Sequence, residues 1–220
     1  MIPKTYNTYI EPFIGSGCIF LSLQPNKWII NDINVDLISL WMVVKDNPLK
    51  LIEHIKRFSK VFVTLSLEGK KKKCQDLSTT LNSIKPGIKR SAYFLLLKFC
   101  AYIGVIMRHG VFVFSGIGHE YLKEDYTPAF FQKSYFDNIQ TVSAYLQNGI
   151  IMNTDYKNVL KLSKRNDFVF LDPPYIEDHD YQFNYNKNEV LDNRFITDLL
   201  KEVRKLDKRG VKWLMTLIHQ

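Results

Sequence analysis

Apolar runs and amphipathic stretches alternate in the first 57 residues of the chain. Each run is short enough for a buried strand, and each amphipathic stretch has its apolar positions at helical spacing. In order, the pattern predicts a strand around 8–10, a helix at about 17–23, a strand at 28–30, a helix from a cap at Asn34 or Asp36 to about Lys45, and a helix from Leu49 to Phe58. This order is typical of the start of a parallel, doubly wound sheet.

The same alternation returns in residues 148–220. The predicted elements are a strand at 150–152, a helix at 156–163, a strand at 167–171, a loop at 176–192, a helix at 194–208 and a strand at 211–218. Gly210 is expected to cap the last helix, because glycine tolerates the left-handed conformation found after helix ends. We therefore predict that 148–220 continues the sheet begun by 1–57.

Residues 58–147 follow a different pattern. Helices are predicted at 90–102 and 135–148, while glycines punctuate a β-like or looped stretch between them. A lysine run at 70–73 precedes a polar stretch, and no strand–helix alternation is visible. We therefore predict an α/β fold whose sheet-forming domain carries a mainly helical inserted subdomain at 58–147.

Composition and charge narrow the class of protein. The chain has 220 residues, of which 46% are hydrophobic and 24% charged, as in ordinary globular domains. Its net charge of +8 fits either a lysine-rich surface or a polyanionic partner, and charge alone leaves both open. No apolar run approaches the ~20 residues of a membrane span. The polar segment from Met1 to Asn7 shows no signal peptide, so no membrane partner is expected.

The cysteines bear on the compartment. Cys18, Cys74 and Cys100 are odd in number and lack the spacing of metal ligands. We therefore expect no disulfide framework, no bound metal and a reducing, intracellular environment.

The candidate chemistry begins with Asp172-Pro173-Pro174-Tyr175, which follows the apolar run at 167–171. Ligands of open α/β sheets bind at the carboxyl ends of strands, where this aspartate is expected. The two prolines lack N–H groups, so their segment offers only carbonyl acceptors, and the tyrosine adds a flat ring. Such a turn suits a planar group that bears an NH2. The alternative is a strand end stiffened by proline.

A second candidate site lies in the first predicted strand–helix turn. Gly15 and Gly17 let the backbone approach a ligand closely, and a helix N-terminus follows. Asp32 ends the next predicted strand, where dinucleotide-binding folds place an acid on ribose hydroxyls. The pattern predicts a nucleotide-type site, with a tight turn and a capping acid as the alternative.

These motifs together resemble the Dam-type DNA adenine methyltransferases of the D12 class, or α-group. The resemblance is carried by Tyr9 to Gly17, by Asn31 to Asn34 and by Asp172 to Tyr175, in this order and spacing. It implies a Rossmann-like sheet that binds S-adenosylmethionine, with the insertion as target-recognition subdomain. By comparison with this family, an N-terminal cofactor-binding motif and a C-terminal β-hairpin are expected to be missing.

The resemblance also implies roles for single residues at the cofactor site. Asp32 would accept hydrogen bonds from the ribose hydroxyls, and Ile33 would pack on the cofactor adenine. Asp155 would contact the adenine amine, cap a helix, or do both. The other residues expected to line the cofactor are Glu11, Pro12, Phe13, Gly15, Gly17 and Asp172.

At the target site, Asp172 and the Pro173 carbonyl would hold the amine, with Pro174 stiffening the turn and Tyr175 stacking on a flipped base. Phe183 and Tyr185 are further stacking candidates, with loop packing as the alternative. Arg108 and the lysine run would contact DNA phosphates, although such a run is also typical of a solvated loop.

The expected function is methylation of the exocyclic amine of adenine in duplex DNA after base flipping. Two alternatives stay open from the sequence. One is a methyltransferase-like module that binds cofactor or nucleic acid without turnover. The other is an amino-methyltransferase acting on RNA or on a protein glutamine.

Overall fold

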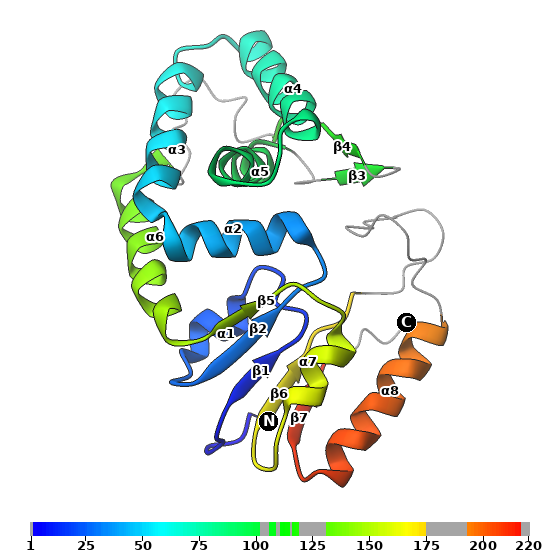
Figure 1. Ribbon diagram of the computed structural model, residues 1–220. Coiled ribbons are helices and arrows are strands. Elements are labelled where there is room, and N and C mark those ends of the chain that lie inside the picture. Colours follow the sequence, from blue (N-terminus) through cyan, green and yellow to red (C-terminus); the bar gives the residue numbers. More distant parts are fainter. Residues whose placement is uncertain are drawn as a thin grey trace. The chain divides into compact units, whose positions relative to one another are not determined.

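The chain folds into two compact units in the computed structural model (Figure 1). The first unit draws on Met1–Ile38, Asn148–Gln182 and Asn188–Gln220, and the second on Ser39–Gln147 and Phe183–Lys187. The structure describes residues 2–101, 106–108, 111–114, 116–118, 131–174 and 193–216.

The first unit contains the strands and helices predicted for the two ends of the chain. Its elements are β1 (Tyr9–Glu11), α1 (Cys18–Leu23), β2 (Trp28–Asn31), the start of α2 (Val35–Asp46), β5 (Ile150–Met152), α7 (Tyr156–Leu162), β6 (Phe168–Leu171), α8 (Asn193–Lys208) and β7 (Lys212–Met215). Gly210 follows α8 with a φ of +69°, as expected of a residue that ends a helix.

The strands form a five-stranded sheet in the order β5-β2-β1-β6-β7, and every neighbouring pair is parallel (Figure 1). The predicted parallel sheet is therefore confirmed. The chain builds outward from β1 through β2 to β5 on one side, and from β6 to β7 on the other. The strand order consequently reverses between β1 and β6, which is where open α/β sheets bind their ligands.

Helices pack on both faces of this sheet. On one face, Ile10 and Val169 belong to a buried apolar cluster with side chains of α7 and α8, including Val159 and Leu199. On the other face, Phe20 of α1 lies 4.9 Å, between ring centroids, from Trp28. Neighbouring residues on each strand thus face opposite layers, which explains why the central strands are apolar on both faces.

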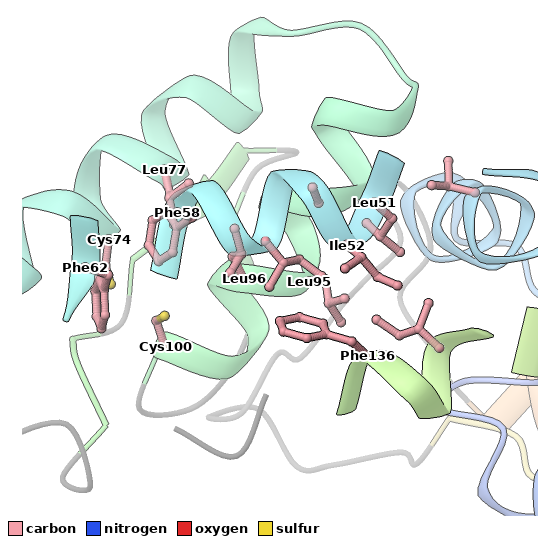
Figure 2. Packing of buried hydrophobic residues seen from close by; sticks show 14 residues of the cluster. Leu51, Ile52, Phe58, Phe62, Cys74, Leu77, Leu95, Leu96, Cys100 and Phe136 are labelled. Atoms are coloured by element: carbon pink, nitrogen blue, oxygen red, sulfur yellow. The ribbon is translucent and has the colours of Figure 1, made fainter. Parts of the chain in front are cut away.

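The second unit is mainly helical in its described part. It contains α3 (Pro48–Phe62), α4 (Leu67–Ser83), α5 (Ile88–Cys100), α6 (Lys133–Tyr145) and an antiparallel pair of strands, β3 (Ile106–Arg108) and β4 (Val111–Val113). Figure 2 shows the core of this unit, in which Ile52 of α3 lies near Leu95 of α5 and Phe136 of α6, and Phe58 of α3 lies near Leu77 of α4.

Helix α4 holds the strand pair through two polar side chains. The Asn82 amide donates to the Phe112 carbonyl over 2.9 Å and accepts from the Phe112 N–H over 2.8 Å. Ser78 Oγ donates to the same carbonyl over 2.9 Å. These contacts replace strand partners that a two-stranded ribbon lacks, and they fix β4 against α4.

The division of the chain differs from the predicted one at its first boundary. The structure divides the units after Ile38, whereas the sequence predicted the division after residue 57. The reason is that α3 buries its apolar stripe, including Leu51 and Ile55, in the helical core of the second unit. The second boundary, between Gln147 and Asn148, is where the sequence predicted it. The functions assigned to the two units stay predictions.

The lysine run is also not a loop. Lys70 to Lys73 lie in α4, whose first turn is capped by Ser66 Oγ accepting from the Gly69 N–H over 3.2 Å. Cys74, Leu77 and Leu81 recur at helical spacing and are buried, so they carry the helix despite its polar surroundings.

Candidate active site at the carboxyl ends of the strands

The carboxyl ends of the parallel strands bring the predicted motifs to one edge of the first unit. Glu11 ends β1, Asn31 ends β2, and Asp172 follows β6. Asp155 follows β5 and precedes α7. Because β1 and β6 are neighbours at the reversal of strand order, the turns that follow them flank the position where such sheets bind a ligand.

The turn after β1 has the backbone shape that its glycines predict. Gly15 and Gly17 have φ angles of +46° and +70°, a region that disfavours other residues. The Ile14 N–H donates to the Asn31 carbonyl over 2.8 Å, and the Gly17 N–H donates to the Ile14 carbonyl over 2.7 Å. The turn is therefore fixed against β2 immediately before α1 begins at Cys18.

Asp32, the residue that follows β2, bonds to this turn through its side chain. Its Oδ2 accepts from the Gly15 N–H over 3.1 Å, and its Oδ1 accepts from the Asn34 N–H over 2.9 Å. Burial raises the pKa of this carboxyl, and the backbone hydrogen bonds oppose that rise. The neighbouring Ile33 is 48% exposed. An acid next to an open apolar side chain offers both acceptors for hydroxyl groups and a surface for a flat ring.

Phe13, which the sequence placed at the cofactor, packs into an aromatic group. Its ring centroid lies 5.3 Å from that of Tyr156 and 6.3 Å from that of Phe195. The side chain is only half-buried. Its packing fixes the turn to α7 and α8, while its predicted contact with the cofactor stays a prediction.

Asn31 is a central site residue that the sequence interpretation did not single out for its side chain. It is fully buried, and its amide donates to the carbonyls of Pro12 and Thr154 over 2.9 and 3.0 Å. Its Oδ1 accepts from the Thr154 N–H over 3.0 Å. One side chain thus joins the turns after β1 and β5 to β2. The sequence does contain a signal for this role, because an asparagine at the end of an apolar strand is expected to be buried and therefore to need hydrogen-bond partners.

Asp155 is the N-cap of α7. Its Oδ1 accepts from the Lys157 N–H over 2.8 Å, and the side chain is exposed. The helix-cap alternative is therefore confirmed, while the cofactor contact stays a prediction. Asn153 supports the same edge, because its amide donates to the Asp32 carbonyl over 2.8 Å.

Glu11 is the buried acid of the site. It is 2% exposed, and its Oε2 accepts from the Tyr9 hydroxyl over 2.7 Å. Burial raises its pKa to about 8, the Tyr9 hydrogen bond lowers it in part, and the nearby Asp172 charge raises it further. Glu11 is therefore mainly protonated at neutral pH.

The turn after β6 begins with Asp172, which follows the buried strand as the sequence predicted. Leu171 is fully buried, Asp172 is exposed and Pro173 is buried again. Asp172 Oδ1 accepts a hydrogen bond from the Thr216 hydroxyl, which follows β7. The Asp172 side chain is thus open to solvent at the end of β6, while the next residue, Pro173, is buried.

The remaining predicted residues lie partly or wholly outside the described residues. Tyr175, Phe183 and Tyr185 fall outside them. Arg108 is described only in its backbone, where it pairs with Val111 in the second unit. These four roles stay predictions.

The lysine run divides into buried and exposed side chains. Lys70 is 9% exposed, and its ammonium lies 5.9 Å from the centroid of the Phe62 ring. Lys71 and Lys72 are exposed. Among the described residues, no helix is long and apolar enough to cross a bilayer, and no group of three or more metal-ligating side chains occurs.

The fold is consistent with that of a Rossmann-like methyltransferase, with a parallel sheet that carries a glycine turn after β1, an acid after β2 and an acid–proline turn after β6. The sequence matches the model of one family, the D12 class N6 adenine-specific DNA methyltransferases, over residues 1–217. The chain belongs to this family, and the predicted resemblance is confirmed.

Curated relatives agree with this assignment. The chain is 32% identical to the type II methyltransferase M.MjaIII of Methanocaldococcus jannaschii over 94% of its own length and 72% of the relative's. It is 31% identical to the type II methyltransferase M1.LlaDCHI of Lactococcus lactis subsp. cremoris over 80% of its own length and 59% of the relative's. A DNA adenine methylase of Haemophilus influenzae is 27% identical over 92% of this chain and 68% of that protein. The chain therefore spans roughly three fifths to three quarters of the length of these relatives.

Proposed function

We propose that this chain transfers a methyl group from S-adenosylmethionine to the exocyclic amine of adenine in duplex DNA. The observation that carries the proposal is the acceptor-only turn at Asp172 and Pro173, which follows β6 directly beside the glycine turn of β1. Membership of the D12 class favours adenine in DNA over RNA or a protein glutamine as substrate, and it favours an enzyme over a binding module.

The residues after β1 and β2 fit a nucleoside with an attached amino acid. Asp32 would accept from the ribose hydroxyls, and the half-exposed Ile33 would cover the adenine ring. Gly15 and Gly17 would bring backbone close to the ligand. When bound, the cofactor supplies an electrophilic methyl group on a sulfonium centre. Asp155 would reach the cofactor adenine from the start of α7.

Asp172 and the Pro173 carbonyl would hold the target amine. The lone pair of this amine is delocalised into the purine ring, so the nitrogen is a poor nucleophile. Two acceptors that draw on its N–H bonds favour a more tetrahedral nitrogen, and the Asp172 carboxylate opposes the positive charge that develops there. The rest of the acceleration comes from positioning.

Adenine must leave the duplex to reach this turn, because a turn at the carboxyl ends of the β-strands cannot enclose a base that is still stacked between its neighbours. Flipping costs a few kcal/mol, and stacking on Tyr175 would return about 1–3 kcal/mol. The exposed Lys71 and Lys72 of α4 would neutralise phosphates, which gives the second unit its role in target recognition.

The test of the proposal is transfer of a radiolabelled methyl group from S-adenosylmethionine to duplex DNA, with RNA and the protein itself as competing acceptors. Wild type and Asp198→Ala are expected to label DNA, because Asp198 is a half-exposed aspartate on α8 that pairs with Lys201. Asp172→Ala is expected to lose transfer while calorimetry still detects cofactor binding. Labelling of RNA or protein in preference to DNA would contradict the proposal, as would full activity of Asp172→Ala.

A further inference from the structure

The residue that follows β7 touches the predicted catalytic carboxylate. The Thr216 hydroxyl donates to Asp172 Oδ1, and its oxygen lies 3.3 Å from the Leu171 carbonyl oxygen. The Thr216 N–H donates to the same carbonyl over 2.9 Å. The two residues thus meet just beyond the last paired positions of β6 and β7, Leu171 and Met215.

Asp172 needs an external constraint because it is exposed. An aspartate beyond the end of a strand has several side-chain rotamers available, and solvent does not select among them. The hydroxyl holds one carboxylate oxygen. Among the described residues, no hydrogen bond is made to the other oxygen, Oδ2.

We propose that Thr216 is a positioning residue for methyl transfer, which fixes the Asp172 side chain so that Oδ2 accepts from the target amine. This inference rests on the proposed function. The side chain of Thr216 is exposed, so it adds little to the core, and its backbone hydrogen bond to Leu171 survives any substitution that keeps the N–H. The hydroxyl is therefore the part of the residue that matters.

A set of three variants separates positioning from folding. Thr216→Val keeps the size of the side chain and removes the hydroxyl, while Thr216→Ser keeps the hydroxyl. Ser163→Ala is the control for loss of a hydroxyl elsewhere in the first unit, because the buried Ser163 hydroxyl donates to the Leu160 carbonyl at the end of α7 rather than to a side chain at the strand ends.

Thr216→Val is expected to lower kcat by about 10- to 100-fold, as loss of a group that orients a catalytic residue does. The KM for S-adenosylmethionine should stay close to that of wild type, because the contact is needed for the amine rather than for the cofactor. Thr216→Ser should restore most of kcat, and Ser163→Ala should resemble wild type. Wild-type kcat in Thr216→Val, or an equal loss in Thr216→Ser, would overturn the proposal.

Nuclear magnetic resonance of the free protein gives a second, activity-independent readout. Couplings across the Asp172 side chain should report one dominant rotamer in wild type and Thr216→Ser, and averaging in Thr216→Val. If wild type transfers no methyl group, the proposed function has failed, and these couplings still decide whether Thr216 orients Asp172. Identical couplings in wild type and Thr216→Val would refute the positioning role.

Discussion

Glu11 and Asp172 stand at the ends of neighbouring strands but in different surroundings. Glu11 is buried against the Tyr9 hydroxyl, whereas Asp172 is exposed and bonded to Thr216. Burial of one carboxyl and exposure of the other separate their preferred charge states. The two acids at the ends of β1 and β6 therefore differ in their access to solvent, and only the Asp172 carboxyl is open to an incoming group.

The raised pKa of Glu11 predicts a specific pH dependence of stability. The folded pKa of about 8 exceeds the usual 4.5, so the folded state binds the proton more tightly than the unfolded state. This contribution is fully present below pH 4.5 and is lost as pH rises through 8. Urea unfolding should show Glu11→Gln gaining stability over wild type between pH 6 and 9, by about a few kcal/mol at most.

The control for this experiment is Glu53→Gln on α3, where the carboxylate is exposed and paired with Arg57. The difference between this variant and wild type should not change over the same pH range. If the difference between Glu11→Gln and wild type were also constant, Glu11 would not be the titrating group.

At the scale of elements, the site depends on how the strand-end turns are joined. Asn31 bonds the turns after β1 and β5, and Asn153 bonds the backbone after β2 to the end of β5. These amides act where the sheet itself offers no ladder partners. The geometry of the candidate cofactor site thus depends on side chains that bond one strand-end turn to another.

Asn31→Ala is expected to destabilise the protein by about 1–3 kcal/mol, because it leaves buried carbonyl and N–H groups of two turns without partners. Chemical denaturation measures this change. Asn158→Ala, which removes an exposed amide that donates to Thr154 Oγ1 and accepts from Lys161 Nζ, should stay within about 0.5 kcal/mol of wild type. Equal stability of the two variants would show that Asn31 does not join the turns.

The elements of the sheet could be predicted from the sequence because each apolar run ends at a polar residue and is followed by a turn or a helix. The acids that follow those runs, Asp32, Asp155 and Asp172, could be predicted for the same reason. Asn31 and Thr216 could not, because their roles depend on which strands become neighbours. The run of lysines in α4 made its helical pattern hard to recognise in the sequence. The sequence grouped α3 with the sheet-forming domain because the helices on which α3 packs lie far along the chain.

At the scale of the whole molecule, positive charge is the property most directly linked to DNA. The chain carries a net charge of +8. Not all of the lysines that carry this charge are exposed: Lys70 is buried, while Lys71 and Lys72 are exposed to solvent. Only exposed cations can release counterions from DNA on contact with phosphates.

A double variant of Lys71→Gln and Lys72→Gln should therefore weaken DNA binding and reduce the slope of log affinity against log salt by about 1 to 2. Fluorescence anisotropy over a salt series measures both. The matched control, Lys161→Gln with Lys208→Gln, removes the same charge from exposed positions at the ends of α7 and α8. If both double variants changed the slope equally, α4 would have no special role in binding.

The most direct test of the account is the chemical identity of the methylated base. Duplex DNA incubated with the protein and S-adenosylmethionine is digested to nucleosides and analysed by mass spectrometry. The account predicts N6-methyl-2′-deoxyadenosine with wild type and none with Asp172→Ala. Methylation of cytosine instead, or equal amounts of methylated adenine with and without the Asp172 carboxylate, would contradict it.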